Sequence, residues 1–402
     1  MNETVKSIFI LGGSSLQIPA IKMAKEKGLY VFVLDYDPKA VGIRYADKFL
    51  EISTIDKDAV LKAAQEYKPD YIITSASDMP VRTVSWVCEK LGKKTDISYE
   101  GSLYATNKVA MRNRMKECGV PIPEYRIIKN IDEFIAIAET MPDKFVLKPA
   151  DNSASRGVVL IDKNKKNDLE EKYNYCIQYS RNGEALVEEF LVGAEVSVEG
   201  YTVEGNHNII TITDKIVSEL PYFVEIGHTE PSRLSDYEQD DIKKVAKAAM
   251  QAIGMRNGPT HTEIKVTSAG AKLIEIAARL GGDHITSHLV PLSTGVDMVN
   301  CSYATLLGET VDCKSKYNRG AAIRFICGKE GVFDSVVGVE EALSIRGVRE
   351  IEIYKTDGDN VQMPRNSSDR IGHIIAVGEN ADEAEENAEE ALSKLKIKYK
   401  EM

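Results

Sequence analysis

The chain has 402 residues, of which 51 are Lys or Arg and 62 are Asp or Glu, so its formal net charge is −11 at pH 7. A chain of this length can hold two or three domains with separate cores. The acidic balance argues against a nucleic-acid or anionic-membrane partner. It does not exclude binding of ATP, because a few local lysines and a Mg²⁺ ion can determine the electrostatic field of one pocket.

The sequence predicts neither export nor a membrane span. No apolar run approaches the roughly 18 residues that a spanning helix needs, and the N-terminal segment lacks the basic region of a signal peptide. The six cysteines are scattered and none forms a C-x-x-C pair. We therefore expect reduced thiols in a cytoplasmic protein, at Cys88, Cys118, Cys176, Cys301, Cys313 and Cys327.

The first hundred residues alternate between apolar runs and amphipathic stretches. Helical periodicity predicts helices at 18–28 and 57–67, the second with Asp56 as its N-cap. The apolar runs predict strands at 7–11, 30–35, 49–52 and 70–74. This alternation is typical of a doubly wound parallel sheet, so we expect an α/β domain over residues 1–105.

Ligands of such sheets bind beyond the carboxyl ends of the strands. Here Gly12-Gly13, Asp35 and Ser77-Asp78 follow predicted strands, and Ser77 and Asp78 are candidate substrate residues. Asp35 at the end of its strand suggests a nicotinamide-dependent oxidoreductase as an alternative. The dinucleotide fingerprint G-x-G-x-x-G is absent, however, which argues against it.

In the rest of the chain, strands and helices no longer alternate in the regular way that is typical of a parallel sheet. Residues 106–120 predict a helix ending at Gly119, and two prolines follow it as in a linker. From about 121 to 310 the pattern indicates an α+β region. After a polar stretch near 311–318 come three strand-like runs and a charged helix at 381–396, which we expect to expose a solvated face.

The segment THTEIKVTSAGAKLIEIAAR, residues 260–279, predicts a β-hairpin. With a three-residue loop at 268–270, Glu263 lies directly opposite Glu275. Strand alternation then places Leu273 and Arg279 on the same face as both glutamates. Opposed carboxylates repel each other, unless they are solvated, protonated or bridged by a cation such as Mg²⁺. A surface glutamate pair with Arg279 as counter-ion remains an equal alternative.

The segment DKFVLKPADNSASRGVVLI, residues 143–161, predicts a strand, a loop of small residues and another strand. Lys148 near the strand end and the loop at 152–157 suit phosphate oxygens, because small residues allow close backbone approach. The loop is not a Walker A motif, since no GK[ST] is present. On this segment alone, a flexible hairpin is the more probable interpretation.

The segment EALVEEFLVGAEVSVEG, residues 184–200, combines an apolar run with three spaced glutamates. Glu188 and Glu189 precede Phe190 and Leu191, and Glu195 follows a glycine. An adenine needs a flat apolar slot with a backbone donor and acceptor, and a ribose needs an acceptor such as Glu195. An amphipathic hairpin with solvated glutamates is the alternative.

The order and spacing of these motifs resemble the ATP-grasp superfamily, and among its members the carboxylate–amine ligases. These include phosphoribosylglycinamide synthetase, carbamoyl-phosphate synthetase halves and L-amino acid ligases. The resemblance runs from about residue 5 to 395. It implies a parallel-sheet domain at 1–105, a two-part α+β ATP-grasp domain at 106–312 with a mobile lid at about 122–192, and a small α+β C-terminal subdomain at 313–402.

The resemblance also implies roles for individual residues. Lys108 and Lys148 would hold the ATP phosphates, Glu195 the ribose, and Arg279 the transferred phosphoryl group. Glu263 and Glu275 would hold Mg²⁺, with Mn²⁺ as an alternative ion. The mobile loop over the phosphates would be formed by Ser153, Ser155, Arg156 and Gly157, and the adenine site by Glu188, Glu189 and Leu191. Further candidate substrate residues are His228, Gly281, Gly282, Asp283 and His284.

One position departs from the family pattern. Members often carry Asn two residues after the second metal-binding glutamate, but Ala277 stands there and cannot coordinate an ion. Either the second Mg²⁺ is absent, or Asp283 or His284 replaces the missing ligand. The opening GGSSLQ also differs from that of phosphoribosylglycinamide synthetase.

The resemblance implies a ligase that activates a small-molecule carboxylate with ATP and passes it to an amine. The acyl phosphate route would release ADP and phosphate, and a homodimer is expected from the family. The candidate activities are a phosphoribosylglycinamide synthetase-like step of purine synthesis and an L-amino acid ligase. A nucleotide-binding protein without ligase activity is the alternative that Ala277 suggests.

Overall fold

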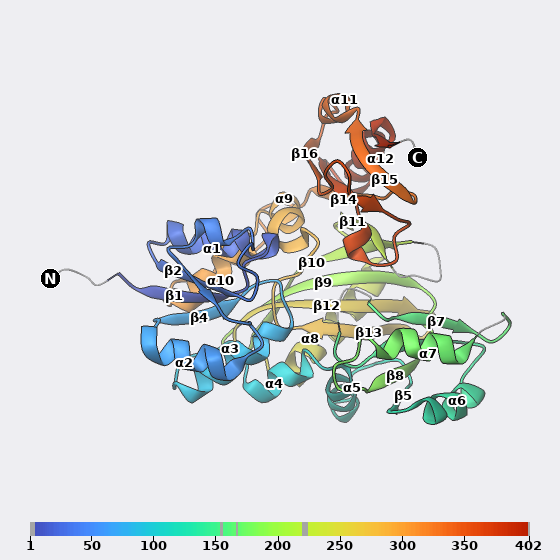
Figure 1. The fold of residues 1–402 in the computed structure, drawn as a ribbon, viewed down its shortest axis with the longest axis horizontal. Coiled ribbons are helices and arrows are strands. Elements are labelled where there is room, and N and C mark those ends of the chain that lie inside the picture. Colours follow the sequence, from blue (N-terminus) through green and yellow to red (C-terminus); the bar gives the residue numbers. More distant parts are fainter. Residues whose placement is uncertain (1–4, 153–155, 166–167, 219–223, 401–402) are drawn as a thin grey trace.

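The computed structural model describes residues 5–152, 156–165, 168–218 and 224–400. Four parallel strands in the order β3-β2-β1-β4 form the first sheet (Figure 1). They are β1 (Ser7–Leu11), β2 (Tyr30–Asp35), β3 (Lys48–Glu51) and β4 (Tyr71–Thr74). The connecting helices are α1 (Ile18–Glu26), α2 (Lys57–Tyr67) and α3 (Met79–Lys90). The predicted parallel sheet is confirmed, and the side chain of Asp56 accepts from the Ala59 amide as the expected N-cap.

A helix from far along the chain covers one face of this sheet. Helix α10 (Met298–Leu307) packs against α1, and the Tyr303 hydroxyl donates to the Ala20 carbonyl at 2.7 Å. Ile8 and Val33 share a core with Tyr303. The N-terminal sheet is therefore fixed to the rest of the molecule by apolar packing.

Two short helices, α4 (Tyr99–Tyr104) and α5 (Lys108–Glu117), lead to a second sheet. This sheet is antiparallel, with the order β5-β8-β6-β7. Its strands are β5 (Tyr125–Ile128), β6 (Lys144–Pro149), β7 (Val159–Asp162) and β8 (Ala185–Glu189), and α6 (Ile131–Thr140) and α7 (Leu169–Ile177) pack against it. Figure 1 shows this unit as the green group at one end of the molecule. We call it the lid sheet.

The largest sheet has eight strands in the order β13-β12-β9-β10-β11-β14-β18-β16. The central part of the chain supplies β9 (Ala194–Val203), β10 (Asn206–Val217), β11 (Glu225–Glu230), β12 (Gly258–Thr267) and β13 (Gly270–Ala277). The C-terminal part supplies β14 (Gly320–Ile326), β16 (Val348–Ile353) and β18 (Gly372–Gly378). Because β11 pairs with β14, one ladder joins the two parts.

The remaining elements cover this large sheet or extend it. Helix α8 (Asp236–Ala252) packs on β10, β12 and β13, while α12 (Ala381–Lys394) packs on β14 and β18. The other elements are α9 (Val290–Thr294), the π-helix η3 (Ile285–Leu289), α11 (Val339–Leu343), and a small sheet of β15 (Gly331–Val337), β17 (Asn360–Val361) and β19 (Lys396–Tyr399). No helix of the described chain is long and apolar enough to cross a membrane.

The hairpin β12–β13 corrects one detail of the sequence analysis. Its loop has two residues instead of three, since Gly270 already pairs with Thr267. A bulge at Ile274 supplies the missing residue, so Glu263 still pairs with Glu275, as predicted. Before the bulge, however, Leu273 pairs with Ile264 and joins the apolar core under α8. The expectation that Leu273 shares the face of the glutamates is therefore wrong.

Candidate functional site

The opposed glutamates of the hairpin each have a lysine partner. Glu275 Oε1 lies 3.0 Å from Lys108 Nζ, at the start of α5. Glu263 Oε1 lies 3.0 Å from Lys215 Nζ, on β10. Burial alone would raise the pKa of Glu263, but Lys215 and His261 outweigh it and hold that pKa well below its usual range. Each glutamate of the pair thus has a cation beside it, which offsets the repulsion between the two side chains.

Lys215 is a site residue that the sequence analysis missed. Its buried ammonium lies 3.0 Å from Glu195, 3.4 Å from Glu225 and 3.0 Å from Glu263. Burial alone would lower the pKa of Lys215, yet these carboxylates raise it well above its usual value. The available signal was a lysine, next to Asp214, in the otherwise uncharged strand pattern IITITDKIV at 209–217.

A second buried cluster surrounds Glu188 on β8. Lys148 Nζ lies 2.6 Å from Glu188 Oε2, and Arg112 Nε donates to Oε1 at 2.7 Å. Arg112 is completely buried and also donates to the Ile274 carbonyl at 2.7 Å. Burial lowers the pKa of Lys148 to about 8, although Glu188 opposes the shift. Both oxygens of the Glu188 side chain are therefore taken up by cations of the protein itself.

Arg112 was also missed, although a signal was available. It follows Lys108 by four residues on α5, and residues spaced in this way share one helix face. Both side chains are buried, which is rare for cations unless a carboxylate or a ligand needs them. The signal in the sequence was the spacing of the two cations on one helix face; their burial, which the structure shows, marks this face as one that binds anionic groups.

Arg279 connects the hairpin to the N-terminal sheet. Its Nε donates to Asp78 at 2.7 Å, and Asp78 stands just before α3, beyond the end of β4. Burial would raise the pKa of Asp78, but the Arg279 guanidinium outweighs this and lowers it. Ser77 lies next to Asp78 and accepts a hydrogen bond from Gln17 at 3.0 Å. The structure thus brings together the predicted anion-binding arginine and two candidate substrate residues.

The turn after Arg279 carries the other candidate substrate residues. Arg370 binds both oxygens of Asp283 at 2.9 Å, and His228 Nε2 lies 3.6 Å from Asp283. Burial lowers the pKa of His228 despite the nearby carboxylate. The ring of His284 contacts His373 instead, with centroids 4.2 Å apart. Asp283 and His284 make no ion pair with Glu263 or Glu275 among the described residues.

Gly281 in this turn is required by its surroundings. A Cβ there would lie 2.8 Å from His261 Nδ1 and 3.0 Å from the Glu199 carboxylate. At Gly282, in contrast, a Cβ would meet nothing within 4 Å. The buried pair His261–Glu199, with a separation of 2.5 Å, therefore fixes how closely the turn approaches the hairpin.

The remaining predicted residues lie around the lid sheet. Glu195 accepts from Lys265 at 3.1 Å as well as from Lys215, and Glu189 pairs with Lys272 at 2.9 Å. Leu191 is buried, and Gly157 has the left-handed φ of +79°. Arg156 is described, whereas Ser153 and Ser155 of the predicted phosphate loop lie outside the described residues.

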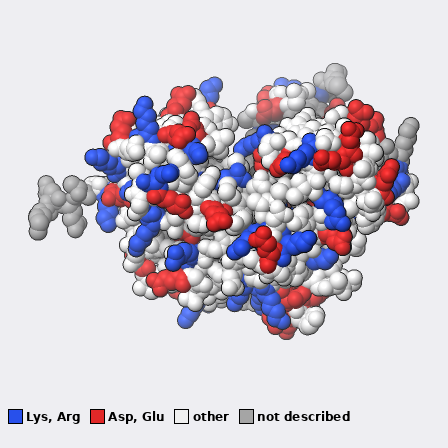
Figure 2. Space-filling view, turned by 90° about the horizontal axis from the view of Figure 1, so that it is seen from below, with Lys and Arg blue, Asp and Glu red and all other residues white. Residues whose placement is uncertain are grey.

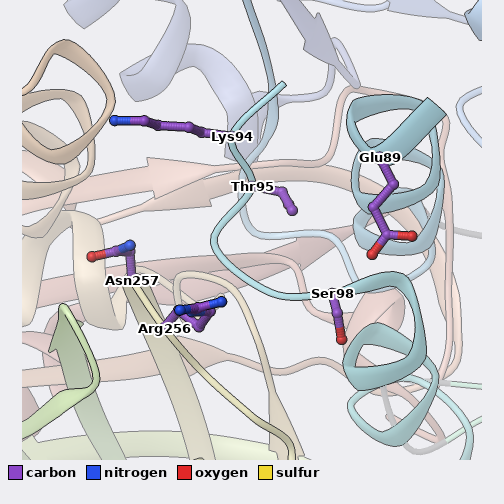
Figure 3. A pocket seen from close by; sticks show the side chains of 6 residues that line it. All are labelled: Glu89, Lys94, Thr95, Ser98, Arg256 and Asn257. Carbon is purple, nitrogen blue, oxygen red and sulfur yellow. The ribbon is translucent and has the colours of Figure 1, made fainter. Parts of the chain in front are cut away.

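A pocket of about 450 Å³ contains none of these predicted residues. Glu89, Lys94, Thr95, Ser98, Arg256 and Asn257 line it (Figure 3). The amides of Arg256 and Asn257 donate to the Asp96 carbonyl, so the pocket marks where the loop after α3 meets the start of β12. On the face seen in Figure 2, basic and acidic side chains are intermixed, without a broad patch of one sign among the described residues.

Comparison with known families matches two parts of the chain. Residues 141–287 match the ATP-grasp domain, and residues 324–400 match the L-amino acid ligase C-terminal domain 2. The chain contains an ATP-grasp domain. The resemblance inferred from the motif order is thereby confirmed.

Individual relatives of this ATP-grasp chain agree with that result. An uncharacterised protein of Sinorhizobium fredii is 27% identical over 387 residues, which cover 93% of this chain and 79% of the relative. Alanine–anticapsin ligase of Bacillus subtilis is 27% identical over 262 residues, which cover 60% of this chain and 54% of the relative. The match thus spans about half the length of that ligase. The expected enzyme class, an ATP-dependent ligase, is confirmed by such relatives.

Among solved structures, the L-amino acid ligase of Bacillus licheniformis has the same fold. Its TM-score is 0.84 at 20% identity, and the alignment covers 100% of both chains. At this identity the likeness concerns the fold alone. It supports an ATP-grasp fold with an N-terminal parallel sheet.

Proposed function

We propose that the protein is an L-amino acid ligase, which joins the carboxylate of one amino acid to the amine of another at the expense of ATP. The observation that carries the proposal is the hairpin β12–β13. It presents two opposed carboxylates, each with a lysine partner, and Arg279 follows two residues after the end of β13. The match of the C-terminal residues 324–400 favours amino acids over other carboxylates.

The donor atoms of the hairpin fit Mg²⁺. Carboxylate oxygens are the ligands that this ion prefers, and Glu263 and Glu275 face each other across the ladder. When bound, Mg²⁺ would neutralise charge on the ATP phosphates. Lys108 and Lys148 would add positive charge at the same phosphates, since Lys108 Nζ already reaches the Asn152 carbonyl, where the phosphate loop begins.

His261 offers an explanation for the missing asparagine. It pairs with Ala277 in the ladder, and its Nε2 lies 3.8 Å from Glu263. Burial alone would lower the pKa of His261, but Glu199 outweighs it and raises that pKa to about 9. The proposed site therefore has one Mg²⁺ ion. At the place where the family often has a further metal ligand, it has the positive charge of the His261 imidazolium.

The chemistry follows from these charges. A substrate carboxylate oxygen attacks the γ-phosphorus of ATP, and the bond to the ADP oxygen breaks. Arg279 would hold the transferred phosphoryl group. The amine nitrogen of the second substrate then attacks the acyl carbon, phosphate leaves with the C–O electron pair, and the amine loses a proton. Ser77, Asp78, His228, Gly281, Gly282 and Asp283 are the proposed substrate contacts; the contacts of His284 are treated below.

ADP release with Mg-ATP and pairs of amino acids tests the proposal. We expect ADP to form with selected pairs, and to be lost in Glu275→Gln but not in the control Glu330→Gln, whose side chain is exposed. ADP formed only with glycine and phosphoribosylamine would instead indicate a purine-synthesis ligase. Binding of ATP without ADP formation for any carboxylate would leave a nucleotide-binding protein.

A further inference from the structure

The strands of the C-terminal part carry a histidine cluster that the proposed ligase reaction does not use. His373 on β18 pairs directly with Glu352 on β16, so both side chains point to one face of the sheet. His284 arrives from the turn before η3, about ninety residues earlier in the sequence. One potential ligand atom from each of these three residues lies within 4.8 Å of the other two.

His373 has a nitrogen that the described protein leaves without a partner. The side chain is completely buried, yet its Nε2 makes no hydrogen bond within the described residues. The nearest carboxylate oxygen, on Glu350, is 3.6 Å away, which is too long for a direct bond. The other ring nitrogen is 2.6 Å from the Tyr354 hydroxyl. A ring fixed at Nδ1 with an open Nε2 is the usual arrangement of a metal-binding histidine.

The backbone is bent to bring His284 to this place. Asp283 and His284 both have positive φ, at +51° and +61°. This conformation costs a non-glycine residue about 1 kcal/mol or more, and such strain is typical of functional turns. The turn directs Asp283 to Arg370 and His284 to His373. It therefore separates the two side chains into two different clusters.

We propose that His284, His373 and Glu352 bind a divalent transition-metal ion of the Zn²⁺ type, at a site distinct from the Mg²⁺ site of the hairpin. Two imidazole nitrogens and one carboxylate oxygen are a common ligand set for such ions, whereas Mg²⁺ prefers oxygen ligands. A tetrahedral ion with bonds of ~2.0–2.2 Å separates its ligand atoms by roughly 3.4 Å. The Glu352 carboxylate lies 3.9 Å from His373 Nδ1, so its exposed side chain would turn toward Nε2 to reach the ion. Water, Glu350 or His288 completes the coordination.

The cluster joins two parts of the fold. His284 lies in the turn before η3, whereas Glu352 and His373 lie on β16 and β18. The ion would tie the turn at Asp283 to the C-terminal strands β16 and β18.

Titration of the full chain with Zn²⁺ tests the proposal, after treatment with a chelator and in excess Mg²⁺. We expect one tight Zn²⁺ per chain, and a Co²⁺-loaded protein with the visible absorption of nitrogen ligation. Glu352→Gln is the first variant, because that side chain is 55% exposed and its loss leaves the core intact. Glu352→Gln and His284→Gln should each weaken binding by at least about tenfold.

Two controls separate this site from others. Glu275→Gln alters the Mg²⁺ site and should leave Zn²⁺ affinity unchanged. His207→Gln removes a histidine that contacts Thr202 instead of the cluster, and it should also have no effect. Equal Zn²⁺ binding by the wild type and the double variant of Glu352 and His284 would overturn the proposal. Loss of binding in Glu275→Gln alone would overturn it as well.

Discussion

Replacing Arg112 by Met should destabilise the protein strongly, because this guanidinium is completely buried. It donates to both oxygens of Glu188, at 2.7 and 3.2 Å, and to the Ile274 carbonyl. Methionine fills much of the volume but donates nothing. The Glu188 carboxylate then keeps only Lys148 as a charged partner, and the Ile274 carbonyl loses its charged hydrogen-bond donor.

The magnitude follows from these contacts. A buried carbonyl left unsatisfied costs about 1–3 kcal/mol, and removing one partner of a buried ion pair typically costs about 3–5 kcal/mol. Because Lys148 still pairs with Glu188, we expect a total loss of roughly 3–5 kcal/mol in the free energy of unfolding. For a domain of about 200 residues this lowers the melting temperature by roughly 6–20 °C.

Thermal unfolding followed by circular dichroism measures this effect. Lys116→Met is the matched control, since it removes the same charge from the same helix at an exposed position. It should change the free energy of unfolding by less than about 0.5 kcal/mol. If Arg112→Met melted within a degree of the control, Arg112 would not be the buried partner of Glu188, and the described cluster would be wrong.

Three further predictions concern the hairpin and its turn. Below pH 6.5 the charged His261 stabilises the folded protein fully, and this stabilisation is lost as the pH rises through about 9. His261→Gln should therefore flatten the pH dependence of the free energy of unfolding between pH 6.5 and about 9, as measured by denaturant unfolding. Gly281→Ala should lower the rate of ADP release by at least about tenfold, because the added Cβ meets the His261–Glu199 pair, whereas Gly282→Ala should leave that rate unchanged. Equal rates of ADP release for the two variants would contradict the close approach of the turn to this pair. Lys215→Met leaves three carboxylates without their shared cation, so the protein should bind Mg²⁺ more tightly but melt several degrees lower. If calorimetry showed an unchanged Mg²⁺ affinity, Lys215 would not compete with the ion for Glu263.

Local sequence patterns predicted the N-terminal sheet and the Glu263–Glu275 pair well. Strand alternation and helix caps are local signals, and they identified β1 to β4 and the Asp56 cap. The glutamate register was right for a partly wrong reason, because a shorter loop and a bulge at Ile274 compensate each other. A bulge depends on what the freed backbone contacts, here Arg112, and the hairpin sequence alone does not contain that information.

The cations of the site were harder to predict than its carboxylates. Lys215 and Arg112 have only weak local signals, because their partners belong to other elements and lie 10 to 162 residues away in sequence. The histidine cluster was hard to predict for the same reason, because its members are far apart in the sequence. Glu352 and His373 become neighbours through strand pairing, and His284 reaches them through an unusual backbone turn. The domain boundaries at 105 and 312 and the lid at 122–192 stay predictions.

The separation of the lid sheet from the eight-stranded sheet determines which kind of contact holds each part of the molecule in place. Among the described residues, strands β5 to β8 share no ladder with β9 to β14, whereas β14, β16 and β18 continue the large sheet. The ion pair Lys272–Glu189 bridges the two sheets instead, and Arg112 on α5 links them by binding both Glu188 on β8 and the Ile274 carbonyl on β13. The two sheets are therefore joined here by charged side-chain contacts, whereas the C-terminal strands are joined to the large sheet by backbone hydrogen bonds.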